Sequence, residues 1–173
     1  MNEPSGRDDD VATDTSLLLN FLRLDRIDIL DQLPGFRFLV LNHVVAEVTE
    51  PVQAERLARG LAEGQLSEFE LTDLDAILDY DNLRQVLGDG EAATIAAAAS
   101  EGMILGMDEK GRARREAEIR LGLGRLLNTP GILVHAVHAG TLTIAQAEQL
   151  RLQLAGERFV IKETIEELLE QTG

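Results

Sequence analysis

The stretch LGDGEAATIAAAASEGMILGMDEKGRARR, which runs from Leu87 to Arg115, decides the fold class of this chain. It begins with the turn Gly88-Asp89-Gly90, in which Asp89 stands where the N-cap of a helix belongs. An Ala-rich segment follows, and Gly102 ends it. These features predict a slim helix that can pack closely against a sheet.

The second half of this stretch predicts a strand with an acid at its end. Met103–Met107 is apolar throughout, which is typical of a strand covered on both faces, and Asp108 follows it directly. Ligands of open parallel sheets bind beyond the carboxyl ends of the strands, so Asp108 is a candidate site residue. Glu91, in the first turn of the preceding helix, can face the same edge.

An acid ends an earlier strand in the same way. Val11–Asp14 reads as the end of a short buried strand, and Thr15 and Ser16 can cap the helix after it. That helix has an apolar face with Leu17, Leu18, Phe21, Leu22 and Leu24, and a polar face with Asn20, Arg23 and Asp25. Taken alone, Asp14 is a simple N-cap. The repetition of the same arrangement at Asp108 favours a functional site.

A further acid lies after the strand predicted over Phe36–Leu41. Asn42 is expected to cap the helix that follows, and Glu47 lies about one turn beyond the start of that helix. The alternative for Glu47 is a solvent-facing residue, which is the usual place of Glu on a helix.

Strands that alternate with helices predict an α/β fold with a parallel central sheet and helices on both faces. Residues 11–173 are expected to form a single domain, and the acidic residues 1–10 a disordered tail. The chain has no P-loop, no GxGxxG motif after a strand and no G-x-S-x-G nucleophile motif.

The amino-acid composition excludes several kinds of site and of protein. The chain has no cysteine, so disulfides and thiolate metal sites are excluded. No apolar run reaches about 18 residues and the acidic N-terminus is unlike a signal peptide, so we expect a cytoplasmic protein without a membrane span. The net charge of −15 argues against a general nucleic-acid binder.

The basic residues are nevertheless unevenly spread. Six of the sixteen Lys and Arg residues follow Asp108 within a short segment: Lys110, Arg112, Arg114, Arg115, Arg120 and Arg125. The segment is either a solvated helix face or a patch that steers phosphates towards an acidic site.

The candidate site residues are four acids: Asp14, Glu47, Glu91 and Asp108. A carboxylate cluster without Cys, and without a third ligand near His135 and His138, selects a hard cation such as Mg²⁺ or Mn²⁺. Such an ion can activate water and neutralise charge on a leaving oxygen, which is the logic of metal-assisted phosphodiester hydrolysis.

These stretches also resemble the PIN-domain family, the fold of VapC-type toxin ribonucleases, and in particular a branch of short prokaryotic PIN-like proteins. The matching segments are TDTS from Thr13, LNHVVAEV around Glu47, LGDGEAATIAAAA around Glu91, MDEKGRAR around Asp108 and TPGILVHAVHAGTL from Thr129. The resemblance spans about Val11 to Leu169 and implies a three-layer PIN-like fold. His43 and Asn42 depart from the pattern, because the family usually has a Pro-containing start before the Glu47 helix.

The resemblance implies that Asp14, Glu47, Glu91 and Asp108 form an acidic metal site. Ser16 matches a hydroxyl that supports the first acid, and Glu109 stands where a second acid often follows, so it is either a supporting or an exposed residue. Lys110, Arg112 and Arg115 are the candidate phosphate contacts.

The resemblance further implies a ribonuclease acting on single-stranded RNA with Mg²⁺ or Mn²⁺, of the toxin–antitoxin type, and a homodimer. The acidic net charge leaves room for a basic, antitoxin-like partner. The first alternative is a catalytically inactive PIN-like interaction module. The second is a small-molecule phosphohydrolase, although no lid segment is evident.

Overall fold

The computed structural model describes residues 8–173, in which five parallel strands form one sheet in the order β3-β2-β1-β4-β5. The strands are β1 (Asp9–Thr13), β2 (Phe36–Leu41), β3 (Ser67–Phe69), β4 (Ile104–Gly106) and β5 (Leu126–Leu127). The α/β class and the parallel central sheet are therefore as predicted.

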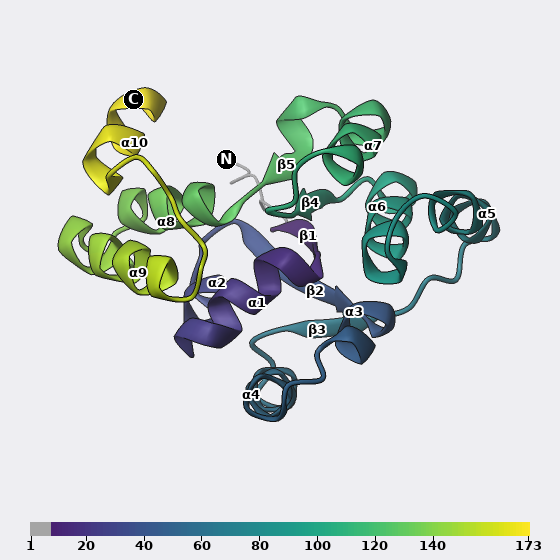
Figure 1. The fold of residues 1–173 in the computed structure, drawn as a ribbon, viewed down its shortest axis with the longest axis horizontal. Helices are drawn as coiled ribbons and strands as arrows, with labels where there is room; N and C mark the ends of the chain where they lie inside the picture. Colours follow the sequence, from purple (N-terminus) through teal and green to yellow (C-terminus); the bar gives the residue numbers. More distant parts are fainter. Residues whose placement is uncertain (1–7) are drawn as a thin grey trace, which may run out of the picture.

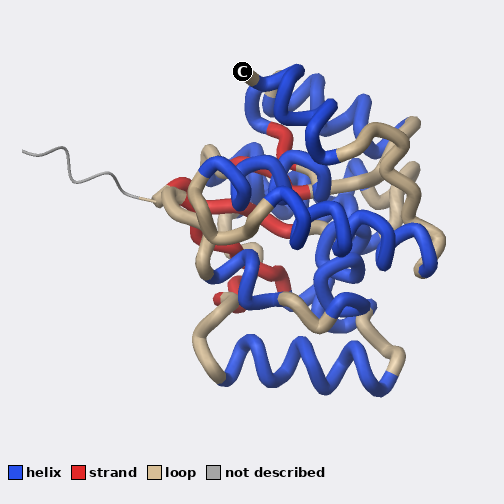
Figure 2. Tube along the Cα trace, turned by 90° about the vertical axis from the view of Figure 1, so that its left-hand side faces the viewer, coloured by secondary structure: helices blue, strands red, loops and turns tan. Residues whose placement is uncertain are grey.

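Helices cover both faces of this sheet (Figure 1; Figure 2). The larger apolar cluster is built mainly from α1 (Thr15–Leu24), α2 (Ile27–Asp31), α4 (Pro51–Ala62), α8 (Thr129–His138), α9 (Ile144–Gly156) and α10 (Ile165–Thr172). The smaller cluster is built mainly from α5 (Leu74–Leu83), α6 (Asp89–Glu101) and α7 (Arg112–Leu121). The short helix α3 (Asn42–Glu47) follows β2, and a 3-10 turn (Leu123–Arg125) precedes β5.

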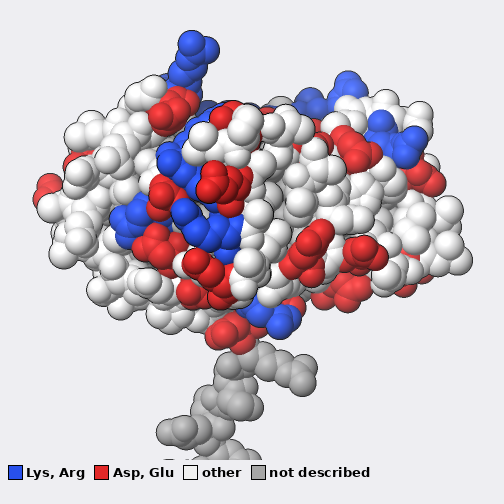
Figure 3. All heavy atoms as spheres, turned by 90° about the horizontal axis from the view of Figure 1, so that it is seen from below, with Lys and Arg blue, Asp and Glu red and all other residues white. Residues whose placement is uncertain are grey.

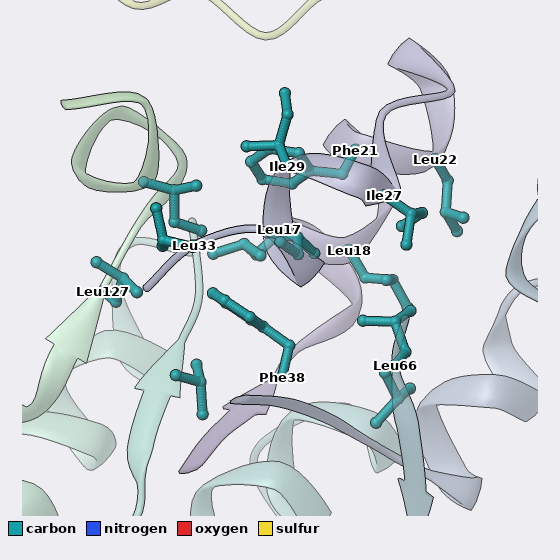
Figure 4. Close-up of a cluster of buried hydrophobic side chains, with 14 of the residues drawn as sticks. Leu17, Leu18, Phe21, Leu22, Ile27, Ile29, Leu33, Phe38, Leu66 and Leu127 are labelled. Carbon is teal, nitrogen blue, oxygen red and sulfur yellow. The ribbon is translucent and has the colours of Figure 1, made fainter. Parts of the chain in front are cut away.

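The sheet contributes side chains to both apolar clusters, one on each of its faces. Val11 of β1 packs into the larger cluster and its neighbour Ala12 into the smaller one, because successive strand residues face opposite sides. On the larger side, Leu17, Leu18 and Phe21 of α1 are fully buried beside Phe38 of β2 (Figure 4). Each such side chain stabilises the fold by about 1.5–3 kcal/mol relative to an exposed one.

The predictions for the starts of β1 and α3 are wrong. β1 begins at Asp9, so the predicted tail of residues 1–10 overlaps a strand; its residues 1–7 lie outside the described part of the chain. Asp10 is tolerated there because Arg37 pairs with it at the amino end of the sheet. Asn42 is the first residue of α3 and not its cap; its Oδ1 accepts a hydrogen bond from the N–H of His43.

The strand order fixes where a ligand can bind. The chain runs from β1 outward through β2 to β3 and then returns to β4 on the other side of β1. The chain therefore leaves β1 towards one edge of the sheet and leaves β4 towards the other. The crevice between these two connections, beyond the carboxyl ends of β1 and β4, is the usual ligand site of open α/β sheets. Across residues 8–173, we find no helix with the length and apolar character that a membrane span requires.

Candidate functional site

Asp14 lies at this crevice, directly after β1, and is almost fully buried, with 1% of its surface exposed. It caps α1: its Oδ2 accepts hydrogen bonds from the Ser16 N–H at 3.3 Å and the Ser16 hydroxyl at 2.7 Å. Its Oδ1 is buried and has no hydrogen-bond partner among residues 8–173. Burial raises the pKa of Asp14 to about 6, the negative charge of Glu91 adds to the rise, and the bonds from Ser16 oppose it.

Asp108 lies two residues after the end of β4, and both of its oxygens are bonded. Oδ2 accepts from the Asn20 amide at 3.0 Å and from the Thr129 hydroxyl at 2.5 Å, while Oδ1 accepts from the Thr129 N–H at 2.9 Å. Burial raises the pKa of Asp108, against the lowering effect of these bonds. This acid therefore connects the end of β4 to α1 and α8.

Ser16 joins the ends of the two strands. Its hydroxyl donates to Asp14 and accepts a hydrogen bond from the Asp108 N–H at 3.1 Å. The backbone reinforces this connection, because the Asp14 N–H donates to the Gly106 carbonyl at 2.8 Å. The two acids predicted at strand ends therefore lie at one edge of the sheet, on either side of one hydroxyl.

Glu91 and Glu109 bring further negative charge to the same edge. Glu91 lies in the first turn of α6, where its Oε2 accepts a hydrogen bond from the Gly88 N–H at 3.1 Å. Glu109 is exposed as a whole, but partial desolvation of its carboxyl group and the charges of Glu91 and Asp108 raise its pKa. Since Glu91 also raises the pKa of Asp14, these carboxylates lie close enough to repel one another.

Glu47 reaches this region from the last residue of α3. One of its oxygens accepts from the hydroxyl of Thr15, the residue after Asp14, and the other accepts from the Gly90 N–H at 2.7 Å. A Cβ at Gly90 would collide with this carboxylate, so only glycine allows the approach. Glu47 is exposed, but it is bonded to the starts of both α1 and α6 rather than left to solvent.

The sequence did not reveal three features of the site. Asn20 was predicted on a polar face of α1, but it is buried and donates to both Asp108 and Thr129. Thr129 is buried and donates to Asp108 through both its hydroxyl and its N–H, whereas Asn128 caps α8. Asp89 was predicted to cap α6, whereas Gly88 is the cap and Asp89 accepts a hydrogen bond from the Tyr80 hydroxyl.

A signal for Asn20 was present in the sequence. It lies four residues after Ser16, so both side chains share one side of α1, and its neighbours Leu17, Leu18 and Phe21 are all apolar. A polar residue with apolar core neighbours, one turn after a polar residue at the edge of the sheet, is a candidate for a buried hydrogen-bonding role.

The arrangement fits a cation at Asp14 but does not form a closed ligand set. Within residues 8–173, no three acidic or histidine side chains stand close enough together to hold a metal ion as they are placed. The oxygens of Glu47 and Asp108 bond instead to Thr15, Gly90, Asn20 and Thr129. The unpartnered Asp14 Oδ1, buried near Glu91, lacks the positive partner that a buried carboxylate requires, and all donors here are oxygens that suit Mg²⁺ or Mn²⁺.

The predicted basic patch divides into two groups. Arg114 pairs with Glu118, Arg120 pairs with Asp79 and Glu116, and Arg125 donates to the Gly102 carbonyl. Lys110, Arg112 and Arg115 are exposed, and no ion pair joins them to another residue in the described range 8–173. Acidic and basic side chains also lie interspersed on the face drawn in Figure 3.

A comparison with protein families agrees with this geometry. A family model described as a PIN domain matches residues 10–173, nearly the whole chain. The chain belongs to the PIN-domain family. The resemblance seen in the sequence is therefore confirmed, and so is the PIN-like layering of helices on both sides of a parallel sheet. PIN domains are in general nucleases that use divalent metal ions. No curated protein and no solved structure matches the chain.

Proposed function

We propose that this PIN domain is a divalent-metal-dependent ribonuclease that hydrolyses phosphodiester bonds of single-stranded RNA. The observation that carries the proposal is the Asp14 carboxylate, which is buried with one oxygen unpartnered beside Glu91 at the carboxyl edge of the sheet. An ionised carboxylate without a partner is costly to bury, so a site that retains one is suited to a positive ligand.

Asp14, Glu91 and Asp108, with Glu47, would hold Mg²⁺ or Mn²⁺. The ion would supply an activated water and neutralise charge on the phosphate and the leaving oxygen. Glu109 adds to the negative field that attracts the cation.

The chain prepares this site through its own hydrogen bonds. Ser16 fixes one oxygen of Asp14 and leaves the other open. Asn20 and Thr129 fix the orientation of Asp108, and Thr15 fixes Glu47. Lys110, Arg112 and Arg115 lie after Asp108 in sequence and are exposed, so their charges are available to bind substrate phosphates.

One observation favours the second candidate, a catalytically inactive PIN-like interaction module. Every oxygen of Asp108 and Glu47 already has a protein partner, as expected for acids that stabilise a fold. The nuclease and the interaction module can be distinguished by whether a divalent metal ion stabilises the folded protein. A ligand that binds only the folded state stabilises it by about 2.7 kcal/mol at one hundred times its dissociation constant.

The test is cleavage of a mixed pool of single-stranded RNA in Mg²⁺ or Mn²⁺, with duplex RNA and single-stranded DNA as comparison substrates. Asp14→Asn and Asp108→Asn keep the size of the side chain and remove a negative oxygen. Each should lower cleavage by more than about 100-fold, because even residues behind a metal ligand contribute 10–100-fold. Asp31→Asn, at an exposed acid of α2, is the matched control.

Cleavage by the wild type and Asp31→Asn that both site variants lack would support the nuclease. Equal cleavage by all four proteins would place the activity elsewhere or in a contaminant. No cleavage, together with a midpoint of thermal unfolding that Mn²⁺ does not change, would favour the interaction module.

The proposal extends to biological role and assembly. We place the ribonuclease in a toxin–antitoxin-type system, as a homodimer with a basic, antitoxin-like partner. The net charge of −15 supports a basic partner, and Leu74 and Leu78, one turn apart on α5 and 69% and 54% exposed, offer apolar surface for assembly. Light scattering of the purified chain tests the dimer. Growth arrest on induced expression, absent in Asp14→Asn, tests the toxin.

A further inference from the structure

The two lysines of this protein meet at one cleft. Lys110 and Lys162 are the only lysines in the sequence, and both line a cleft of about 300 Å³ beside Asp108. Lys110 precedes α7, whereas Lys162 lies in the segment between α9 and α10. Both are exposed, and across residues 8–173 neither takes part in an ion pair.

The cleft has an acidic end and an apolar wall. Asp108 and Glu109 lie at the acidic end, which belongs to the proposed metal site. Pro130, Phe159 and Val160 supply the apolar wall, and Val160 is 66% exposed. A cleft lined by apolar side chains and two cations matches the parts of a nucleotide, which has a flat base and a charged phosphate.

The other charged residues of the cleft fit the same ligand. Arg114 pairs with Glu118 at 2.7 Å, so its charge is largely compensated. Glu163 would repel a phosphate, but its carboxylate can accept hydrogen bonds from the amino edge of a base.

Overall charge makes these lysines more important. At a net charge of −15 the chain as a whole repels RNA, so binding depends on cations placed locally. We propose that the cleft binds one nucleotide of single-stranded RNA next to the cleaved phosphate. Lys110 and Lys162 contact phosphate oxygens, and Phe159 and Val160 contact the base. This inference rests on the ribonuclease proposed above and adds the segment between α9 and α10 to its substrate site.

The first test uses the amines themselves. Asp14→Asn protein in EDTA, which leaves RNA intact, is acetylated with an amine-selective reagent, with and without a short mixed-sequence RNA, and both lysine peptides are quantified by mass spectrometry. Binding as proposed slows acetylation of both Lys110 and Lys162. Protection of Lys110 alone would remove the α9–α10 segment from the site and overturn the inference.

The salt dependence of RNA affinity gives a second readout. Removing one phosphate contact lowers the slope of log affinity against log salt by about 0.7 for a single strand. Lys162→Ala should show this loss and Lys162→Arg should not. Arg37→Ala, which makes the same change of charge at the opposite edge of the sheet, should leave the slope unchanged.

The apolar wall is tested by Val160→Asp. Val160 is largely exposed, so the fold should tolerate this change. We expect RNA binding to weaken several-fold, whereas Ile119→Asp on α7, at a residue 76% exposed and outside the cleft, should have little effect. If the wild type cleaves RNA but Lys162 is neither protected nor needed for the salt slope, the nuclease stands and the cleft is wrong. If no RNA is bound or cleaved, the proposed function fails and this inference fails with it.

Discussion

Asp14 and Asp108 follow neighbouring parallel strands, yet the protein holds them in different ways. Asp14 receives its side-chain hydrogen bonds from Ser16, two residues further along the chain, and keeps one oxygen unpartnered. Asp108 receives its bonds from Asn20 on α1 and Thr129 on α8, and has no unpartnered oxygen.

A buried acid can stabilise the fold through its hydrogen bonds, and it can destabilise the fold through the cost of burying its charge. Asp108 joins three elements, so its loss should weaken the fold. Asp14 is buried with an unpartnered oxygen, so its ionised form costs stability until a cation is bound. Two acids in equivalent positions of the sheet are therefore expected to respond in opposite directions when they are replaced.

The largest effect on stability is expected at Asp108. Asp108→Ala removes the acceptor of three hydrogen bonds from Asn20 and Thr129, and should lower the free energy of unfolding by about 3 kcal/mol. Urea denaturation of the metal-free protein measures this. Asp31→Ala should change it by less than about 0.5 kcal/mol. If both variants lose equally little, the hydrogen bonds of Asp108 contribute no stability.

The opposite sign is expected at Asp14. Its pKa is about 6 in the folded chain and about 3.8 in the unfolded chain, so the folded state binds the proton more tightly. Its contribution to stability is full below about pH 4 and is lost as the pH rises through 6. Asp14→Asn removes this dependence and should stabilise the metal-free protein by up to about 3 kcal/mol at pH 8.

Urea denaturation of wild type and Asp14→Asn from pH 4 to 8 measures this effect, and the two curves should converge at the acidic end. Curves that stay parallel over the whole range would show that Asp14 does not have a raised pKa. Added Mn²⁺ should narrow the gap at pH 8, because it stabilises only the wild type.

A smaller effect is expected at Thr129. Thr129→Val keeps the shape and the backbone N–H bond, but removes the hydroxyl that donates to Asp108 and accepts from Asn20. We expect a loss of about 1.5 kcal/mol in the free energy of unfolding, and less for Thr129→Ser. Combined with Asp108→Ala the losses should not add, since both variants break the same bond. Full additivity would contradict the shared network.

The smallest effect on stability is expected at Gly90. Gly90→Ala pushes aside the flexible Glu47 carboxylate, and the better helix propensity of Ala offsets the lost hydrogen bond, so stability should change by less than about 0.5 kcal/mol. RNA cleavage should nevertheless fall, as in Glu47→Gln. Unchanged cleavage in both would place Glu47 outside the site.

The sequence predicted the elements well where the pattern is local. The strand over Phe36–Leu41 has the predicted bounds, because an apolar run is recognised over a few residues. The edge position of Asp14 and Asp108 follows from the same runs. α2 (Ile27–Asp31) was not predicted, because five residues are too few to show a helical period.

The partners of the acids could not be predicted in the same way. Asn20 meets Asp108 and Thr129 only because α1 and α8 pack on the same face of the sheet near the end of β4. Arg120, predicted within a basic patch, pairs with Asp79 because α7 packs on the same side as α5. These pairs join residues far apart in sequence, and no periodic pattern encodes them.

The sequence by itself therefore determined the alternation of strands and helices, the family and the acids that end the strands. Only the tertiary structure decided which of those acids keeps an oxygen free, which is bonded to two helices, and which cations share a cleft with them. The physical reason is range: backbone preferences and burial patterns are set by neighbours in the chain, whereas the hydrogen-bond partner of a buried carboxylate is set by how distant elements pack.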